Sequence, residues 1–218
     1  MVVDLSIFLD KMSFKIHTII NNPIDSNCFI VYSRNKKCIV IDPGSENSEE
    51  IINFLESNNL NLEYIILTHE HFDHVWSVND LKVKYKSKVI ASRLCGEKIT
   101  NAKKNMSVFY NQVGFECFNC DISIESIQNK IQWEDEEIIF IETPGHTECS
   151  ISIVIKNNIF VGDLMIPSHK TVTKLPSGNK EILKKSLEDM FSEYKNFKIY
   201  PGHGDVFELR EKSINSFI

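Results

Sequence analysis

Short runs rich in Ile, Val and Phe recur along the chain between polar turn residues, and this composition predicts β-strands. The predicted strands are 14–20, 27–33, 37–42, 63–67, 88–91, 137–142, 151–155, 159–161 and 198–200. The first three follow one another closely, so we expect a β-meander at the start of the fold. Asn157 and Asn158 predict a hairpin turn between the seventh and eighth strands.

Between these strands, apolar residues recur at helical spacing, which predicts amphipathic helices. The predicted helices are 75–85, 94–105 and 182–194, together with one that begins after 47–50 and ends near 57–59. The first of these in chain order starts with the form of a capping box, because Asn47 precedes Glu50 by three positions. Residues 106–129 show no clear period. No Pro-, Gly- or Ser-rich linker divides the chain, so we expect one mixed α/β domain over 1–218.

The composition narrows the class of protein. Of the 218 residues, 42% are hydrophobic and 25% are charged, which is typical of a globular protein and excludes disordered and collagen-like classes. The net charge of −6 opposes binding to phosphate backbones and to anionic membrane surfaces. We therefore expect neither nucleic acid nor a membrane as a partner.

Targeting signals and cysteines indicate the compartment. The stretch 1–15 contains Asp4 and Asp10 and lacks the apolar run of a signal peptide, and no window approaches 18 apolar residues. We therefore expect a cytoplasmic protein, in which the six cysteines are mostly reduced thiols. Cys117 and Cys120 form a lone Cys-x-x-Cys pair, which is more typical of two ordinary thiols than of a redox or zinc site.

Histidines are concentrated behind predicted strands. Five of the seven lie in turns directly after a strand, and these are His69, His71, His74, His146 and His203. Residues 68–74 bring three imidazoles together with the carboxylate of Asp73, and imidazole and carboxylate are ligands of zinc and iron. A solvated polar loop would explain one His-x-His pair. Because the turns at 143–146, 162–163 and 200–204 each place another ligand type after an apolar strand, we predict a metal site instead.

Four motifs carry a resemblance to a known family. They are HEHFDH at 69–74, TPGHT at 143–147, VGD at 161–163 and PGHGD at 201–205. Together they resemble the metallo-β-lactamase superfamily over nearly the whole chain, from the first strands to His203. The resemblance implies an αββα sandwich, in which two mixed β-sheets are flanked by helices and the site lies at one sheet edge.

The resemblance also implies a role for each ligand, because all seven family positions are filled. His69, His71 and His146 match the first metal site; Asp73, His74 and His203 match the second; Asp163 matches the bridging carboxylate. The turn at Asp42 matches an early family Asp that would hold the site from behind the ligands. Two divalent ions are the expected cofactors, with zinc favoured and iron or manganese as alternatives.

The activity expected from this ligand set is hydrolysis. Two ions about 3.5 to 4 Å apart can share a hydroxide, since binding lowers the pKa of water toward about 7. In a dinuclear hydrolase of this kind, Asp163 and Asp73 are the catalytic residues: Asp163 bridges the ions, and Asp73 relays a proton. The best-fitting branch is the glyoxalase II-like hydrolases, so we expect a small-molecule substrate that is a thioester or a related ester.

Other branches of the superfamily give alternative functions. A persulfide dioxygenase-like enzyme would use a single iron held by His69, His146 and Asp163. A lactonase is less favoured, and so is a non-catalytic metal-binding module, because such modules commonly lose ligands. His71 disfavours a flavodiiron oxygen reductase, which would carry Glu at that position. Asp163 disfavours a secreted β-lactamase, which generally has Cys in its second site.

The chain departs from glyoxalase II in two places. Only 15 residues follow His203, where that enzyme carries a helical domain that helps to bind glutathione. Residues 175–179 resemble the family's loop but lack its usual Gly-Arg pair and Asp, so glutathione recognition stays open. Phe109 and Tyr110 would form a pocket wall or serve the core, and His169 would face substrate or solvent.

Overall fold

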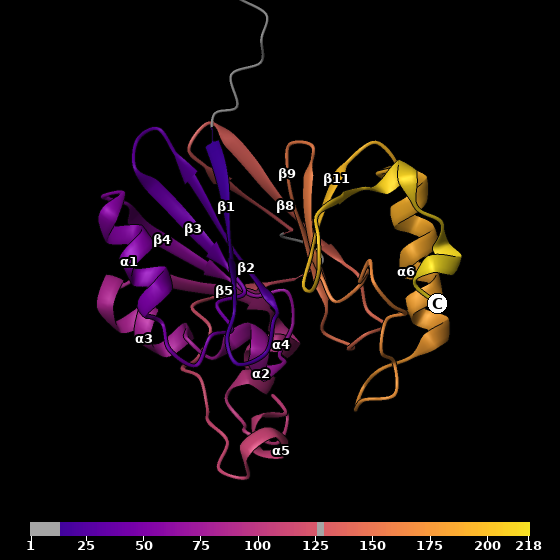
Figure 1. Cartoon of the computed structure of the whole chain (residues 1–218), viewed down its shortest axis with the longest axis horizontal. Coiled ribbons are helices and arrows are strands. Elements are labelled where there is room, and N and C mark those ends of the chain that lie inside the picture. Colours follow the sequence, from indigo (N-terminus) through magenta and orange to yellow (C-terminus); the bar gives the residue numbers. More distant parts are fainter. Residues whose placement is uncertain (1–13, 126–128) are drawn as a thin grey trace, which may run out of the picture.

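Two six-stranded sheets pack face to face in the computed structural model, which describes residues 14–125 and 129–218 (Figure 1). The first sheet consists, in order, of β1 (Phe14–Ile20), β2 (Asn27–Ser33), β3 (Lys37–Ile41), β4 (Asn61–Ile66), β5 (Lys88–Ser92) and β6 (Ile122–Ile124). Its first three strands are antiparallel, which confirms the expected meander, and β3 to β6 are parallel. The carboxyl ends of β3, β4 and β5 therefore reach the same edge.

The second sheet has one parallel pair. Its order is β12 (Phe207–Glu208), β11 (Lys198–Pro201), β10 (Asn158–Gly162), β9 (Ile151–Ile155), β8 (Glu136–Glu142) and β7 (Lys130–Trp133). Only β10 and β11 are parallel among these neighbours. The predicted hairpin is present as β9 and β10, with its turn at Lys156 and Asn157 and a positive φ of 53° at Lys156. β7 and β12, both short edge strands, were not predicted.

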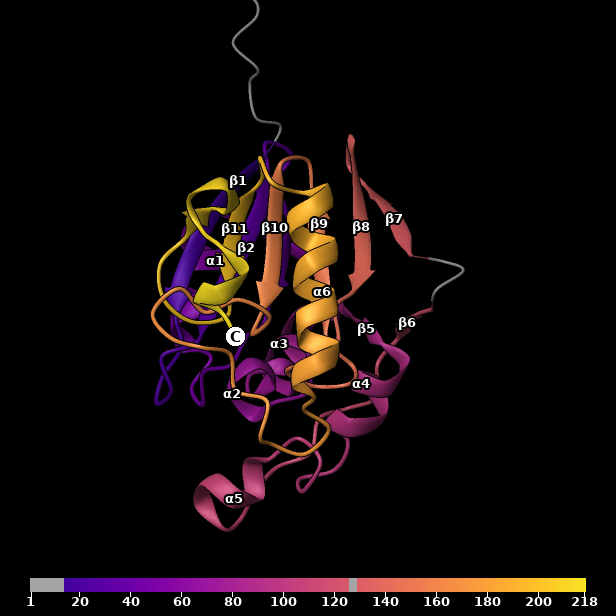
Figure 2. The same cartoon turned by 90° about the vertical axis from the view of Figure 1, so that its right-hand side faces the viewer.

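Helices cover the outer faces of both sheets, which confirms the αββα sandwich (Figures 1 and 2). The first sheet is covered by α1 (Glu49–Ser57), α3 (Val78–Tyr85) and α4 (Arg93–Ile99), and the second by α6 (Lys180–Glu193). Two shorter helices, α2 (Phe72–Val75) and α5 (Ser107–Asn111), lie beyond one edge of the sandwich, and the short turns η2 (Leu209–Glu211) and η3 (Ile214–Ser216) follow β12.

The hydrophobic core lies in three layers, and β3 shows how the sequence builds them. Ile39 and Ile41 belong to the cluster between the sheets, whereas Cys38 and Val40 belong to the cluster under the helices of the first sheet. Successive side chains of a strand point to opposite faces, so a strand that is covered on both sides is apolar throughout. Phe29 of β2 packs against Phe160 of β10 across the interface between the sheets, with ring centroids 5.3 Å apart.

The predicted helix at 75–85 begins later, as α3 at Val78, and Val75 is instead the last residue of α2. The chain breaks at Ser77, whose backbone N–H donates to the carbonyl of Pro43 at 2.9 Å and whose hydroxyl donates to that of Ser45 at 2.5 Å. These contacts hold Ser77 against the loop after β3. A tertiary interaction thus overrides the local helical periodicity.

The predicted helix at 94–105 ends early, at Ile99. The side chain of Asn105 donates to the carbonyl of Ile99 at 3.3 Å and to that of Phe115 at 2.8 Å, which draws the chain into tight turns. α5 and β6 then lie within 106–129, where no element was expected. Of that stretch, residues 126–128 lie outside the described part of the chain.

Two further expectations concern the start of the chain and of α1. The capping box does not form: Ser48 is the N-cap of α1, and the side chain of Asn47 accepts the N–H of Glu49 instead, at 2.8 Å. The stretch 1–15 was not expected to be a signal peptide. Its residues 1–13 lie outside the described part of the chain. Within the described ranges, no helix has the length and hydrophobicity needed to cross a membrane.

Candidate metal centre

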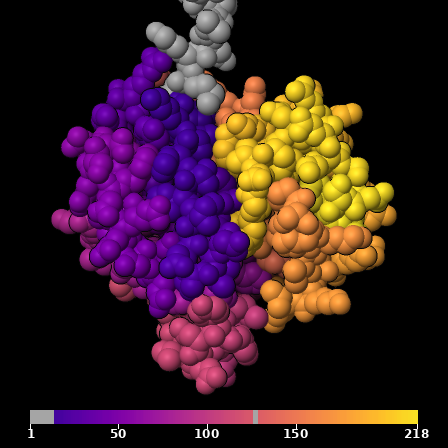
Figure 3. Space-filling model, viewed as in Figure 1, coloured from indigo at the N-terminus to yellow at the C-terminus, as the bar shows by residue number. Residues whose placement is uncertain are grey.

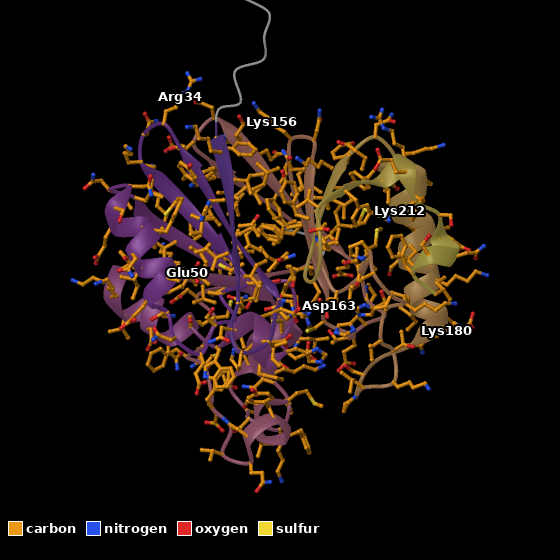
Figure 4. The ribbon with its side chains drawn as sticks, viewed as in Figure 1. Arg34, Glu50, Lys156, Asp163, Lys180 and Lys212 are labelled. Carbon is orange, nitrogen blue, oxygen red and sulfur yellow. The ribbon has the colours of Figure 1, made fainter. Side chains whose placement is uncertain are left out.

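The seven predicted ligands converge at one edge of the sandwich, where both sheets end. His69, His71, Asp73 and His74 follow β4, His146 follows β8, Asp163 follows β10 and His203 follows β11. Figure 4 labels Asp163 between the two halves of the molecule. One detail differs from the expectation: His74 lies inside α2 rather than in a turn, and His71 is the extended residue that precedes this helix.

The potential ligand atoms gather in two main groups. His69, His71 and His146 form one group, and Asp73, His74 and His203 form another; the ligand atoms of each group lie within 4.8 Å of one another. These groups coincide with the two predicted metal sites. A third, overlapping group contains Asp42 with His69 and His74.

Asp163 lies between the two groups. Its Oδ2 is 3.4 Å from Nε2 of His146 in the first group and 3.7 Å from Nε2 of His203 in the second. Its Oδ1 is 3.4 Å from Nε2 of His74. A carboxylate that faces both groups has the geometry that a bridging ligand requires.

The hydrogen bonds of Thr68 orient His69. The Thr68 hydroxyl donates its one proton to Oδ2 of Asp42, at 2.6 Å, so it accepts from Nδ1–H of His69, at 3.0 Å. That arrangement leaves the lone pair of His69 Nε2 free and aimed into the site. Asp42 reaches His69 through Thr68 and contacts His74 directly, because its Oδ2 lies 3.0 Å from Nδ1 of His74.

Carbonyl oxygens orient two further histidines in the same way. His146 Nδ1 donates to the carbonyl of Val172 at 2.8 Å, and His203 Nδ1 donates to that of Asp25 at 3.2 Å. Both rings therefore present Nε2 to the site. His71 is turned the other way, since its Nδ1 lies 3.0 Å from Nε2 of His146.

Unsatisfied atoms show that the site suits a metal ion. Nε2 of His69, Nε2 of His74 and Oδ1 of Asp163 are buried and make no hydrogen bond among the described residues, although the last two atoms lie 3.4 Å apart. Buried polar groups are almost always paired, so three orphans at one point call for a ligand of their own. Nitrogen and carboxylate oxygen donors fit zinc, iron or manganese.

Electrostatics give the same indication. Burial opposes charge on His74, but the carboxylates of Asp73, Asp163 and Asp42 outweigh it and raise its pKa to about 10. Burial and the charge of neighbouring His146 lower the pKa of His71 to about 4. The carboxylates thus concentrate negative charge at the second group, and a bound cation would have to displace a proton from the His74 imidazole.

Close packing explains the glycines in the turns around the ligands. A Cβ on Gly202 would lie 2.2 Å from Oδ1 of Asp163 and 2.9 Å from Cε1 of His74. A Cβ on Gly44 would lie 1.5 Å from the carbonyl oxygen of Asp73. Only glycine lets these two turns approach the ligands so closely.

A buried ion pair supports the site and was missed in the sequence. Glu70 is 2% exposed, and its carboxylate accepts from Lys98 Nζ at 2.8 Å and from the thiol of Cys149 at 2.8 Å. Lys98 also bonds to Glu148 at 3.0 Å and to Ser177 at 3.1 Å. The lysine therefore connects the HEHFDH segment to two other loops. In the sequence, the position of Glu70 between His69 and His71 was the signal that could have indicated this pair.

The other residues that the sequence singled out lie either in the lining of a cavity at the site or in the hydrophobic core. Phe109 and Tyr110 line a cavity that opens at the ligands, which agrees with the pocket-wall alternative and not with the core alternative. His169 lines the same cavity and is also exposed to solvent. Cys117 and Cys120 instead pack in the core under the helices of the first sheet. Their thiols contact backbone carbonyls, and both are free cysteines.

With this geometry, the class of protein follows. Residues 21–203 match the metallo-beta-lactamase superfamily, and the chain belongs to that superfamily. Hydroxyacylglutathione hydrolase 1 of Vibrio vulnificus (strain YJ016) is 37% identical over 142 residues, which are 65% of this chain and 48% of that protein. The match thus spans about half the length of that relative.

Two further similarities cover more of both chains. The probable metallo-hydrolase MJ0888 of Methanocaldococcus jannaschii is 30% identical over 202 residues, 83% of this chain and 88% of that protein. The crystal structure of BLEG-1 B3 metallo-beta-lactamase superposes with a TM-score of 0.85 at 21% identity, over 90% of this chain and 95% of that one. The latter likeness is one of fold.

Proposed function

We propose that the chain is a dinuclear metal-dependent hydrolase that cleaves a small-molecule thioester or a related ester. The observation that carries the proposal is the pair of ligand groups on either side of Asp163, each with its ligand atoms within 4.8 Å. The similarity to a hydroxyacylglutathione hydrolase supports the thioester as the substrate class.

The residues take distinct roles in this proposal. His69, His71 and His146 would hold one ion, Asp73, His74 and His203 would hold the other, and Asp163 would be the ligand shared by both. When bound, the two ions supply Lewis-acid polarisation of the scissile carbonyl and acidify water. Zinc is the favoured ion, with iron or manganese as alternatives.

Two carboxylates face the substrate, because both Asp73 and Asp163 line the cavity. We assign the bridging position to Asp163. Asp73 Oδ2 lies 3.3 Å from Nε2 of His203. We propose that Asp73 accepts the proton that the attacking water loses when its oxygen adds to the acyl carbon. That proton then passes to the thiolate as the carbon–sulfur bond breaks, which leaves a carboxylic acid and a thiol.

The loop at 175–179 lacks the Gly-Arg pair and the Asp that are usual in glyoxalase II, so glutathione is not a required part of the proposed substrate. Its Asn179 caps α6, since the side chain accepts the N–H groups of Glu181 and Ile182 at 3.0 and 3.1 Å. The proposal therefore extends to thioesters in general and does not specify the thiol.

Elemental analysis of the purified protein, combined with a panel of thioesters, lactones and phosphodiesters, tests the proposal. We expect about two zinc-like ions per chain and turnover of thioesters. His71→Asn should reduce the metal content, whereas His17→Asn should not, because His17 stacks on Phe54, outside the ligand groups. No turnover of any thioester would overturn the proposal. A single iron retained without His71, His74 and His203 would instead support persulfide oxidation.

A further inference from the structure

A cavity of about 400 Å³ opens directly onto the candidate metal centre. Part of its lining consists of candidate ligands, namely His71, Asp73, His146, Asp163 and His203. The volume falls within the range of about 300 to 1,000 Å³ that is usual for small-molecule sites. A group attached next to the scissile bond would therefore lie in this cavity.

One wall of the cavity comes from α5 and the residue before it. Met106, Phe109 and Tyr110 line it. The ring of Tyr110 stacks on Phe72, with centroids 4.9 Å apart, and Phe72 directly precedes Asp73. In Figure 3 the segment around α5 projects from the lower side of the molecule. The aromatic stack anchors this projecting segment beside the ligands.

The opposite wall comes from the segment between β10 and α6. Ile166, Val172 and Leu175 line the cavity from this side. Val172 is also tied to the metal centre, because its carbonyl accepts the Nδ1 proton of His146 at 2.8 Å. Both walls thus have fixed positions relative to candidate ligands, so a group between them would have a defined orientation toward the centre.

The two walls expose apolar surface to solvent. Phe109 is 68% exposed, Tyr110 44%, Val172 42% and Leu175 38%. Single exposed apolar residues are common, but several around one cavity mark a binding site, since burying them against an apolar ligand is favourable.

The charge of the lining sets the chemistry of the ligand. None of the described residues that line the cavity is Lys or Arg; apart from the candidate ligands, the polar groups are the imidazole of His169 and the hydroxyl of Tyr110. A carboxylate placed between the apolar walls would displace water from them without gaining a cationic side chain among the described lining residues. The walls therefore favour an uncharged group.

We propose that this cavity binds an uncharged, apolar group next to the scissile bond, so that the protein prefers thioesters with an apolar chain or ring to the charged thioesters of glutathione. The inference rests on the proposed thioester hydrolysis. The apolar group can belong to the acyl side or to the thiol side, because the cavity chemistry is the same for both.

Two substrate series test the preference and distinguish the two sides. In the first, acetyl, butyryl and hexanoyl groups are carried by N-acetylcysteamine; in the second, the acetyl group is carried by ethanethiol, butanethiol and hexanethiol. We expect kcat/KM to rise about two- to fourfold per methylene in one of the series. Flat profiles in both, or a higher kcat/KM for S-D-lactoylglutathione than for every apolar substrate, would overturn the inference.

Matched variants connect the effect to the cavity. Phe109→Ser should lower kcat/KM about fivefold more for the longest chain than for the shortest one. Phe118→Ser is the control, because Phe118 is also exposed, at 49%, and is not among the lining residues. Equal effects of the two variants would contradict the inference.

A binding measurement keeps this test separate from the proposed function. Trp76 reports on the cavity, since its ring centroid lies 5.7 Å from that of Phe72 and 5.8 Å from that of Tyr110. Butanamide, hexanamide and octanamide are titrated into the metal-free protein, and tryptophan fluorescence is followed, with Trp76→Phe as the control for its origin.

If no thioester is hydrolysed, the proposed function fails, and this titration by itself tests whether the cavity binds apolar groups. Affinity that rises about two- to fourfold per methylene and falls in Phe109→Ser supports an apolar binding site. The absence of a saturable response to octanamide would overturn it.

Discussion

The carboxylate of Asp42 contacts the imidazole of His74, with Oδ2 of Asp42 3.0 Å from Nδ1 of His74, although the two residues are 32 positions apart. Both side chains are buried. The same carboxylate accepts the backbone N–H of Thr68 at 2.8 Å and its hydroxyl at 2.6 Å. Asp42 thereby orients His74 directly and His69 through Thr68, so one residue outside the ligand set controls one ligand of each group.

Asp42→Asn should weaken metal binding while the protein stays folded. The amide keeps the shape of the carboxylate but removes the negative charge that favours Nδ1–H on His74. Loss of such an outer partner typically lowers metal affinity about 10- to 100-fold. Competition with a chromophoric chelator measures the change, and Asp135→Asn, at an exposed position in the turn between β7 and β8, is the control. Unchanged affinity would show that Asp42 has no role in tuning the ligands.

Asp163→Ala should lose most of the bound metal and activity without unfolding. Asp163 is the carboxylate that faces both ligand groups, so its removal leaves each group one donor short. Elemental analysis, activity and circular dichroism are compared with those of Asp189→Ala, an exposed aspartate on α6. A variant that is active and fully metallated would exclude the bridging role.

Gly202→Ala should impair the centre through a steric clash alone. The added Cβ would lie 2.2 Å from Oδ1 of Asp163 and 2.9 Å from Cε1 of His74, so at least one of the two ligands must move. We expect a fall in metal content, because the positions of ligand atoms must hold to within a few tenths of an ångström. Metal content comparable to that of the unsubstituted chain would mean that the turn relaxes away from the ligands instead.

Lys98→Met should destabilise the fold by about 3 kcal/mol, because it leaves the buried carboxylate of Glu70 without its cation. Chemical denaturation measures the free energy of unfolding. Adding Glu70→Gln to Lys98→Met should recover part of the loss, since the second change removes the uncompensated charge.

An exposed ion pair is the control for Lys98. Lys84 bonds to Glu56 at 2.8 Å, but its side chain is 42% exposed and that of Glu56 is 56% exposed. Lys84→Met should therefore change the stability little, because solvent screens an exposed pair. Similar losses in the two variants would contradict a special role for the buried pair.

Much of the sheet structure could be predicted from the sequence. The strands expected at 14–20, 27–33 and 151–155 coincide with β1, β2 and β9. Each is an apolar, β-branched run between turn residues, and that information is local. The breaks at Ser77 and Ile99 could not be predicted, because they depend on hydrogen bonds to carbonyls of Pro43 and Phe115, which adjoin them only in the folded chain.

For the candidate metal centre, too, some features were predictable from the sequence and others were not. The sequence by itself identified the residues that gather at the centre, because HEHFDH and the turns at His146, Asp163 and His203 resemble the motifs of the superfamily. That the strands before them end at one edge is a property of the folded sheets. Only the tertiary structure decided which nitrogen of each ring faces the centre, because the partners that set it, such as the carbonyls of Val172 and Asp25, lie far along the chain.

The complete cavity and the Glu70–Lys98 pair likewise depend on the tertiary structure, although the sequence offered Phe109 and Tyr110 as candidate wall residues. The cavity walls come from α5 and from the segment before α6, and neither has a hydrophobic period that marks it as a binding surface. Local patterns of hydrophobic residues determine strands and donors, because these depend on near neighbours. Cavities, buried pairs and ring orientations depend on contacts between distant segments, which exist only once the two sheets have packed.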